Sequence, residues 1–84
     1  MSPKQLLKSI LERAVRLGLP DRDVELAREF LAIHDFGLCL DTVVTQVCEE
    51  GVRVDEEFYR EVKEAAGKLG LAGEKVERVK ELVG

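Results

Sequence analysis

The chain has 84 residues, of which 45% are hydrophobic and 36% are charged, so its composition is typical of one small globular domain, residues 1–84, and excludes a disordered segment. No apolar run approaches the roughly 18–20 residues that a membrane-spanning helix needs, and the N-terminus lacks the apolar core of a signal peptide. We therefore expect a cytoplasmic protein with no membrane partner, and a chain this short has little room for a deep substrate cavity.

A first helix is expected over residues 3–17. The segment Ser2-Pro3-Lys4-Gln5 is typical of a helix start, because its serine and glutamine can form a capping box around a proline at the first helical position. The apolar residues that then recur at helical spacing are Leu6, Leu7, Ile10, Leu11, Ala14, Val15 and Leu17. Gly18 is expected to stop this helix, and Leu19 to fold back onto Ala14.

A second helix is expected to follow Pro20, with Asp21 as its capping residue. Its apolar face is predicted to contain Val24, Ala27, Phe30, Leu31 and His34, and to be widened by Leu26 and Ile33. The apolar pattern changes after His34, so we expect the helix to end there and a new element to begin.

The third stripe of apolar residues, from Phe36 to Val47, fits a helical period better than a strand and is ended by Gly51. Residues 52–54 are expected to form a short extended link. Asp55 is then predicted to cap a fourth helix, with acidic residues in its first turn. That helix should end at Gly70, and a shorter fifth helix should follow from about Gly73.

These elements, joined by connections of a few residues, predict an all-α fold: a compact bundle of about five short antiparallel helices with the third helix at its centre. A weak internal repeat also occurs, since residues 9–31 align with residues 61–83 at eight of 23 positions. Two equivalent helical hairpins would explain this repeat. The shared chemistry of a Leu-Gly-Leu corner, which occurs in both segments, would explain it equally well.

Residues able to perform catalysis or bind metals are scarce. His34 is the only histidine, and it is expected to be structural. Cys39 and Cys48 lack the close Cys-x(2–4)-Cys spacing of a structural zinc site, so we expect two free thiols in a reducing compartment. No Gly-rich phosphate loop occurs either. We therefore expect no enzymatic activity, no cofactor and no metal; an enzyme built on His34 and a low-pKa thiol is the alternative.

The net charge of −4 is concentrated in the middle of the chain, where residues 35–64 contain nine acidic and three basic residues. Nucleic acids attract clusters of Lys and Arg, so this acidic balance argues against a nucleic-acid partner. It is typical instead of a docking surface for a basic protein, where opposite charges speed association and fix orientation. The alternative is plain solvation of these acids, helped by the dipole at the start of the fourth helix.

Residues 19–71 resemble the MafI-type immunity proteins, which are small helical partners of bacterial polymorphic toxins. The segments that carry this resemblance are Leu19-Pro20, Ala27-Arg28-Glu29-Phe30-Leu31, His34-Asp35-Phe36-Gly37-Leu38, Leu40-Asp41, Gln46, Glu49-Glu50, Val52-Arg53-Val54-Asp55, Glu57-Phe58-Tyr59 and Lys68-Leu69-Gly70-Leu71. The chain departs from the family pattern at Cys39, where a small residue such as alanine is usual, and at Asp35, where glutamate is frequent.

The resemblance implies a protein without enzymatic activity that binds the toxic C-terminal domain of a cognate toxin and protects the producing cell. Toxins of this kind are often nucleases, which need basic surfaces to hold phosphates. An acidic inhibitor would suit such a target. The resemblance therefore gives the expected basic partner an identity, namely the C-terminal domain of a cognate toxin.

Charge and helical phase indicate which residues would contact this partner. Leu38, Phe36 and Tyr59 are the candidate anchors, and Phe36 belongs to the core instead if it is buried. The acidic residues expected to surround the anchors are Asp41, Glu49, Glu50, Asp55, Glu56 and Glu57. The alternative function is a helical self-association or regulatory module, because leftover apolar surface on a small domain can form a homodimer.

Overall fold

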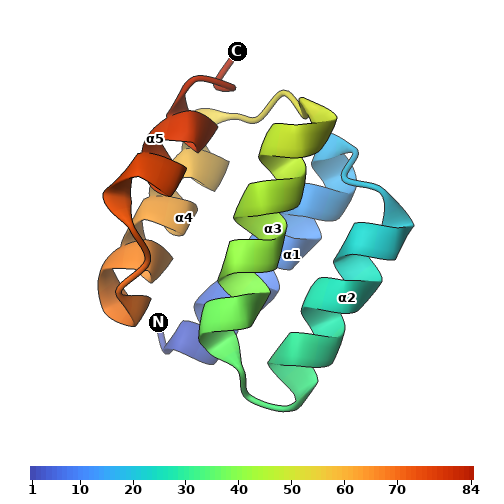
Figure 1. Cartoon of the computed structure of the whole chain (residues 1–84), viewed down its shortest axis with the longest axis vertical. Coiled ribbons are helices and arrows are strands. Elements are labelled where there is room, and N and C mark those ends of the chain that lie inside the picture. The colour runs from blue at the N-terminus through green and yellow to red at the C-terminus, as the bar shows by residue number, and fades with distance from the viewer.

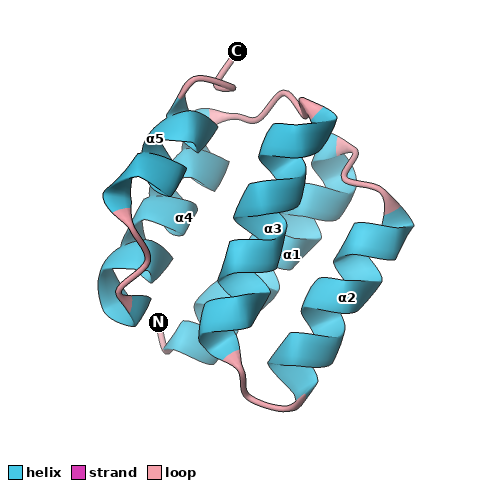
Figure 2. Cartoon of the chain, viewed as in Figure 1, coloured by secondary structure: helices cyan, strands magenta, loops and turns pink.

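Five helices form the computed structural model, which describes all of residues 1–84, and successive helices run in alternating directions (Figures 1 and 2). They are α1 (Pro3–Leu17), α2 (Asp21–Ala32), α3 (Phe36–Glu50), α4 (Glu56–Leu69) and α5 (Gly73–Lys80). The predicted all-helical bundle is therefore confirmed. None of its helices combines the length and the apolar character needed to cross a membrane.

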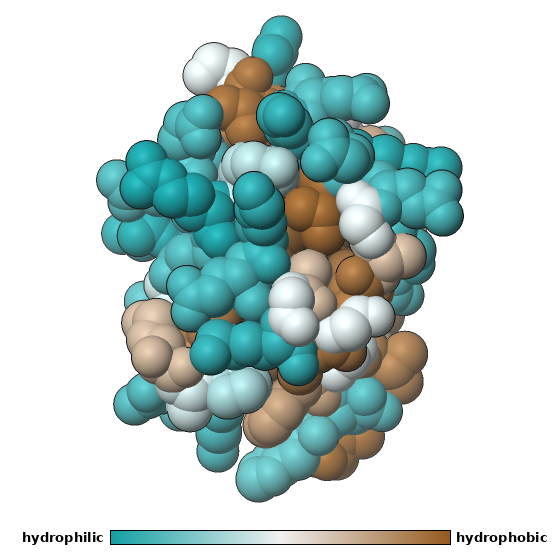
Figure 3. Space-filling view, turned by 90° about the vertical axis from the view of Figure 1, so that its left-hand side faces the viewer, coloured by the Kyte–Doolittle hydropathy of each residue, from teal (hydrophilic) through white to brown (hydrophobic).

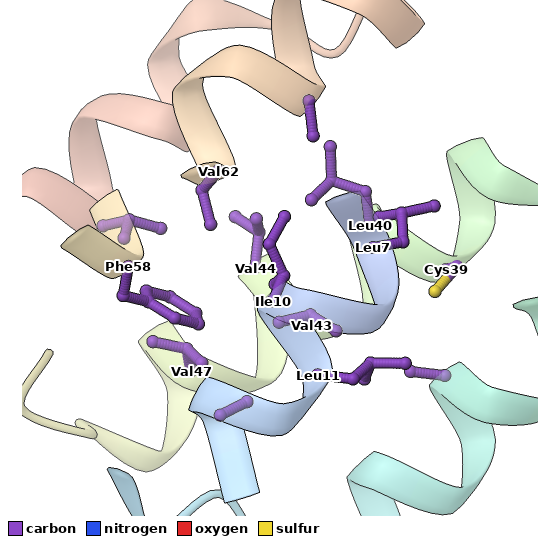
Figure 4. Close-up of a cluster of buried hydrophobic side chains, with 14 of the residues drawn as sticks. Leu7, Ile10, Leu11, Cys39, Leu40, Val43, Val44, Val47, Phe58 and Val62 are labelled. Carbon is purple, nitrogen blue, oxygen red and sulfur yellow. The ribbon is translucent and has the colours of Figure 1, made fainter. Parts of the chain in front are cut away.

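Helix α3 lies at the centre of the bundle, as predicted. It is the one helix that packs against all four others, whereas α5 contacts only α3 and α4 (Figure 1). The core side chains that Figure 4 labels converge from three helices: Leu7, Ile10 and Leu11 from α1, Cys39, Leu40, Val43, Val44 and Val47 from α3, and Phe58 and Val62 from α4. Each fully buried aliphatic side chain of this kind contributes about 1.5–3 kcal/mol relative to exposure.

The two Leu-Gly-Leu corners have the same geometry. Gly18 and Gly70 adopt left-handed backbone conformations with φ of 104° and 74°, which a residue without a Cβ adopts readily. In the first corner the Leu19 N–H donates to the Ala14 carbonyl at 3.0 Å, and the equivalent bond in the second corner, from residue 71 to residue 66, is 3.1 Å long. The internal repeat thus corresponds to two equivalent corners, joining α1 to α2 and α4 to α5.

The start of α2 differs from its prediction. Asp21 is not the capping residue, because it is already the first residue of the helix and no side chain caps it. The capping position belongs to Pro20, which has no side-chain oxygen. Two acidic residues of the first turn, Asp21 and Asp23, lie close to the positive end of the helix dipole instead.

The end of α2 also differs, because the helix stops at Ala32 rather than at His34. His34 adopts a left-handed conformation, with φ of 60°, and is exposed rather than part of the apolar face. Its N–H donates to the Leu31 carbonyl at 3.0 Å, and the next N–H, from Asp35, donates to the Phe30 carbonyl at 2.9 Å. This pattern is a Schellman motif in which a histidine takes the position usually occupied by glycine.

Besides His34, three residues predicted for apolar faces are exposed: Val15 on α1 by 43% of its surface, and Leu26 and Ile33, at the edge of the α2 face, by 42% and 71%. Helix α2 lies at the edge of the bundle and contacts only α1 and α3 (Figure 1). Helix α2 therefore buries a narrower stripe of its surface than a helix with three or four neighbours. Leu26 and Ile33 flank this buried stripe and remain exposed to solvent.

Residues 52–54 form the predicted extended link, which also holds the end of the chain. Val54 is buried and forms an isolated parallel β-bridge with Val83. Its N–H donates to the Leu82 carbonyl at 3.1 Å, and the Gly84 N–H donates to the Val54 carbonyl at the same distance. The residues that follow α5 are thereby fastened to the linker between α3 and α4.

Candidate functional site

The outward side of α3 is formed by residues at helical spacing. Leu38, Thr42, Thr45 and Glu49 lie opposite the buried stripe of the helix, and Asp41 borders them on the side of α5. All of α3, from Phe36 to Glu50, lacks lysine, arginine and histidine. The side of this helix opposite the core therefore presents one exposed leucine, two threonine hydroxyl groups and acids, and no basic residue.

The predicted contact residues do not form one patch around two anchors. Leu38 and Glu49 are separated along α3 by about 17 Å, given a rise of about 1.5 Å per residue. Glu49 and Glu50 lie instead at the end of the bundle where Asp55 caps the start of α4 (Figure 1). Tyr59, the second anchor, lines a groove between α4 and α5. The predicted site thus divides into the outer side of α3, one end of the bundle and a separate groove.

Several of the predicted acids interact with basic residues of the same chain. Asp41 pairs with Lys75, Glu50 lies 3.5 Å from the guanidinium of Arg22, and a Glu57 oxygen lies 2.9 Å from Arg13. Exposed pairs of this kind contribute about 0–1 kcal/mol, so a partner's cation can replace them at small cost.

Asp55 and the remaining two acids differ in their local role. An oxygen of Asp55 accepts the Phe58 N–H at 2.8 Å, so this residue caps α4 as predicted. Glu49 and Glu56 are exposed and make no ion pair or side-chain hydrogen bond. These two carboxylates are therefore the acids of the predicted set that the fold itself does not use.

Phe36, the conditional third anchor, is half-buried and packs against the core. Its ring stacks on the imidazole of His34, with centroids 5.6 Å apart and an angle of 24° between the ring planes. Asp35 lies between them in sequence and caps α3, since its side chain accepts the Leu38 N–H at 3.2 Å. Phe36 thus belongs mainly to the structural turn between α2 and α3.

Sequence reasoning missed a polar cluster between α1 and α4. The carboxylate of Glu61 accepts hydrogen bonds from Ser9 Oγ at 2.9 and 2.8 Å and from Arg13 Nε at 2.8 Å. Partial burial alone would lower the pKa of the Arg13 guanidinium, but the hydrogen bonds and charges of Glu61 and Glu57 raise it above its usual value. No local pattern of residues signals this cluster, because Ser9 and Arg13 are 52 and 48 positions away from Glu61.

A second unpredicted feature is Asp23, which is only 4% exposed. One of its oxygens lies 3.4 Å from Arg22 Nε, and the other, Oδ2, is buried without a hydrogen-bond partner. A carboxylate three residues after the capping position can bond back to the N–H of the capping residue, but here that residue is Pro20, which has no N–H. The helix dipole remains as the favourable interaction for this charge.

The two thiols have properties that disfavour nucleophilic chemistry. Burial raises the pKa of Cys39 to about 11. Burial also raises the pKa of Cys48, an effect opposed by the charge of Arg78 and reinforced by that of Glu81. Since the thiolate is the reactive form, both thiols are weak nucleophiles at neutral pH. The structure contains no group of three or more His, Cys, Asp or Glu side chains placed to hold a metal ion.

Comparisons of the chain with known protein families, with curated proteins and with solved structures gave no match.

Proposed function

We propose that the chain is an immunity protein, a binding module without catalytic activity that neutralises the basic toxic domain of a polymorphic toxin in the cytoplasm of the producing cell. The observation that carries this proposal is the outer side of α3, where exposed Leu38 and Glu49 and half-buried Asp41 occur on a helix without a single basic residue. The resemblance of residues 19–71 to MafI-type proteins supports the same role.

Electrostatics would act first in this role. Acidic residues attract a basic domain and orient it during the encounter, and these effects weaken as salt is added. Once bound, the inhibitor would exclude a phosphate-bearing substrate, because it occupies the same basic surface or lies beside it and repels the substrate. Either route requires contact with the toxin and no chemistry by the inhibitor.

The proposal is tested by producing this chain together with the toxin domain encoded next to its gene. We expect cell survival to depend on the chain, and the two proteins to purify together at low salt and to separate more readily at high salt. Loss of protection and of co-purification for the unaltered chain would overturn the immunity role.

The contribution of α3 is tested by Glu49→Lys, with Glu64→Lys on α4 as the matched control. Both glutamates are exposed and unpaired, and both changes alter the net charge equally. Lysine is favoured by the dipole at the end of α3, so Glu49→Lys should not lower the melting temperature. We expect it to weaken toxin binding about tenfold or more, and the control much less. Equal affinities for both variants would remove Glu49 from the interface.

Self-association remains the second candidate, because exposed Leu38 and Ile33 provide apolar surface that a homodimer could bury. Sedimentation of the chain alone over a range of concentrations distinguishes the two. A mass that rises with concentration, together with cell survival that does not require the chain, would favour this candidate.

A further inference from the structure

Three of the five exposed large hydrophobic residues of the chain lie on one side of the molecule. They are Leu26 and Ile33 on α2 and Leu38 on α3, exposed by 42%, 71% and 46%. Together with Glu29, Thr42 and Glu49 they define what we call the α2–α3 face. Isolated exposed apolar residues are common in proteins, but a group on two adjacent helices indicates an interaction surface.

The position of Leu26 and Ile33 follows from the contacts of α2. The opposite edge of this helix faces α1, since Arg28, Leu31 and Ala32 line a groove with α1 residues. Leu26, Glu29 and Ile33 follow helical spacing on the other edge and on the outside, next to α3. They therefore lie on the side of the bundle that is turned away from α1, which is the side facing the viewer in Figure 1.

The contacts of α3 place Leu38 on the same side. One edge of α3 faces α5 through the pair Asp41–Lys75, and the other faces α2 through the pair Glu50–Arg22. The line of Leu38, Thr42 and Glu49 lies between these edges, opposite the buried stripe. In Figure 3 this side of the molecule forms the right-hand edge, and hydrophobic residues gather at its lower part.

Charge determines which occupant suits this face. The apolar residues are bordered by Glu29 on α2 and by Asp41 and Glu49 on α3, and α3 offers no cation. Asp41 is already paired with Lys75, and Arg22 pairs with Glu50 at the edge of the face, whereas Glu29 and Glu49 have no ion pair. Two copies of the chain packed through this face would therefore bring unpaired glutamates of both copies into one interface, and this excess of negative charge costs free energy. A partner whose surface has an apolar patch surrounded by lysine or arginine would bury the apolar side chains of this face and pair with its acids.

The size of a stable interface supports the use of both helices. A standard protein interface buries about 800 Å² on each partner, which is about one sixth of the 4834 Å² of accessible surface here. The single exposed leucine of α3 cannot anchor such an area, whereas two helices with three apolar anchors can.

We infer that the α2–α3 face is the docking site for the toxin domain, and that its occupant is a surface of that domain with apolar side chains ringed by lysine and arginine. This inference rests on the proposed function and adds to it a two-helix interface in which Leu26, Ile33 and Leu38 provide the anchors and the acids provide orientation.

The test is the double variant Leu26→Gln/Leu38→Gln, measured against the same toxin domain. Glutamine has nearly the helix propensity of leucine, so α2 and α3 should be retained. The matched control is Val15→Gln on α1, because this residue is exposed to the same degree, 43%, but lies outside the face. Thermal unfolding of each variant verifies that the fold persists.

We expect the double variant to bind the toxin domain at least about tenfold more weakly, and Val15→Gln to bind like the unaltered chain. Normal affinity of the double variant would overturn the inference and leave the proposed function intact. Failure of the unaltered chain to bind would overturn both. A homodimer of the free chain that the double variant abolishes would also overturn it, because the occupant would then be a second copy.

Discussion

At the scale of single residues, carboxylates of the same chemical type have different roles because of what each one contacts. Glu61 is half-buried and accepts hydrogen bonds from two donors, Ser9 and Arg13, Asp55 caps a helix, and Glu49 forms no ion pair with a basic group of the chain. Replacing Glu61 or Asp55 would remove interactions that the fold needs, whereas replacing Glu49 would not. Candidate partner residues are therefore the acids that folding leaves unused.

The same reasoning predicts how Cys39 responds to pH. Its pKa is 9.0 for an ordinary thiol and about 11 in the fold, so between these values the unfolded chain binds fewer protons than the folded one. Stability is unaffected well below pH 9 and falls as the pH rises toward 11, by up to about 3 kcal/mol. Urea unfolding at increasing pH measures this loss.

The variant Cys39→Ala is the control for this prediction, since it lacks the titrating group and isolates the contribution of the thiol from those of tyrosine and lysine. We expect its stability to fall less steeply above pH 9. Rapid alkylation of Cys39 in the folded chain at neutral pH would contradict the raised pKa and revive the alternative of a redox enzyme.

At the scale of elements, the same backbone motif ends several helices with different residues. Gly18 and Gly70 provide the left-handed position at two Leu-Gly-Leu corners, and His34 provides it at the end of α2. Glycine adopts this conformation without steric cost, while any other L-residue is strained there. Glycine is therefore favoured at a corner but is unfavourable within a helix.

This contrast predicts opposite effects for two alanine substitutions in and after α4. Gly70→Ala should lower the free energy of unfolding by about 1 kcal/mol, because φ is 74° at that position. Gly67→Ala should raise it by about 0.5–1 kcal/mol, because Gly67 is inside the helix and open space surrounds the position of its missing Cβ. Thermal unfolding of both variants checks the pair, and effects of the same sign would refute the argument.

At the scale of the whole molecule, hydrogen bonds between side chains far apart in sequence join the two hairpins of the helical bundle. Ser9 and Arg13 on α1 hold Glu61 on α4, and so connect the first helical hairpin to the second. Helix α3 fills the space between them and leaves only its outer side exposed. This small protein can thus expose the α2–α3 face while the contacts between α1 and α4 hold the opposite side of the bundle together.

The connection between the hairpins predicts measurable coupling between Ser9 and Glu61. Ser9→Ala removes a hydrogen bond to a charged, half-buried group and should lower the free energy of unfolding by about 1–2 kcal/mol. In the background of Glu61→Gln the same change should cost less, which a double-mutant cycle detects. Additive effects of the two changes would show that this bond contributes nothing to stability.

Local signals were sufficient to predict the five helices, since capping residues, apolar spacing and glycine corners act within a few positions. The prediction that Asp21 caps α2 is wrong because the residue type favours a capping aspartate, whereas the capping position belongs to Pro20 and the helix already begins at Asp21. The exposure of Leu26 and the role of Glu61 depend on which helices become neighbours. This information lies in the packing of the bundle and not in any local segment.

The β-bridge between Val54 and Val83 offers a single-atom reporter of cooperativity. The amide hydrogen of Val54 is held by the carbonyl of Leu82, on a segment that shares no helix with it. Its rate of deuterium uptake therefore records how frequently the chain's last turn detaches. If the Val54 amide exchanges as slowly as the amides in the centre of α3, the whole molecule opens as one unit. If it exchanges faster, the residues after α5 detach independently.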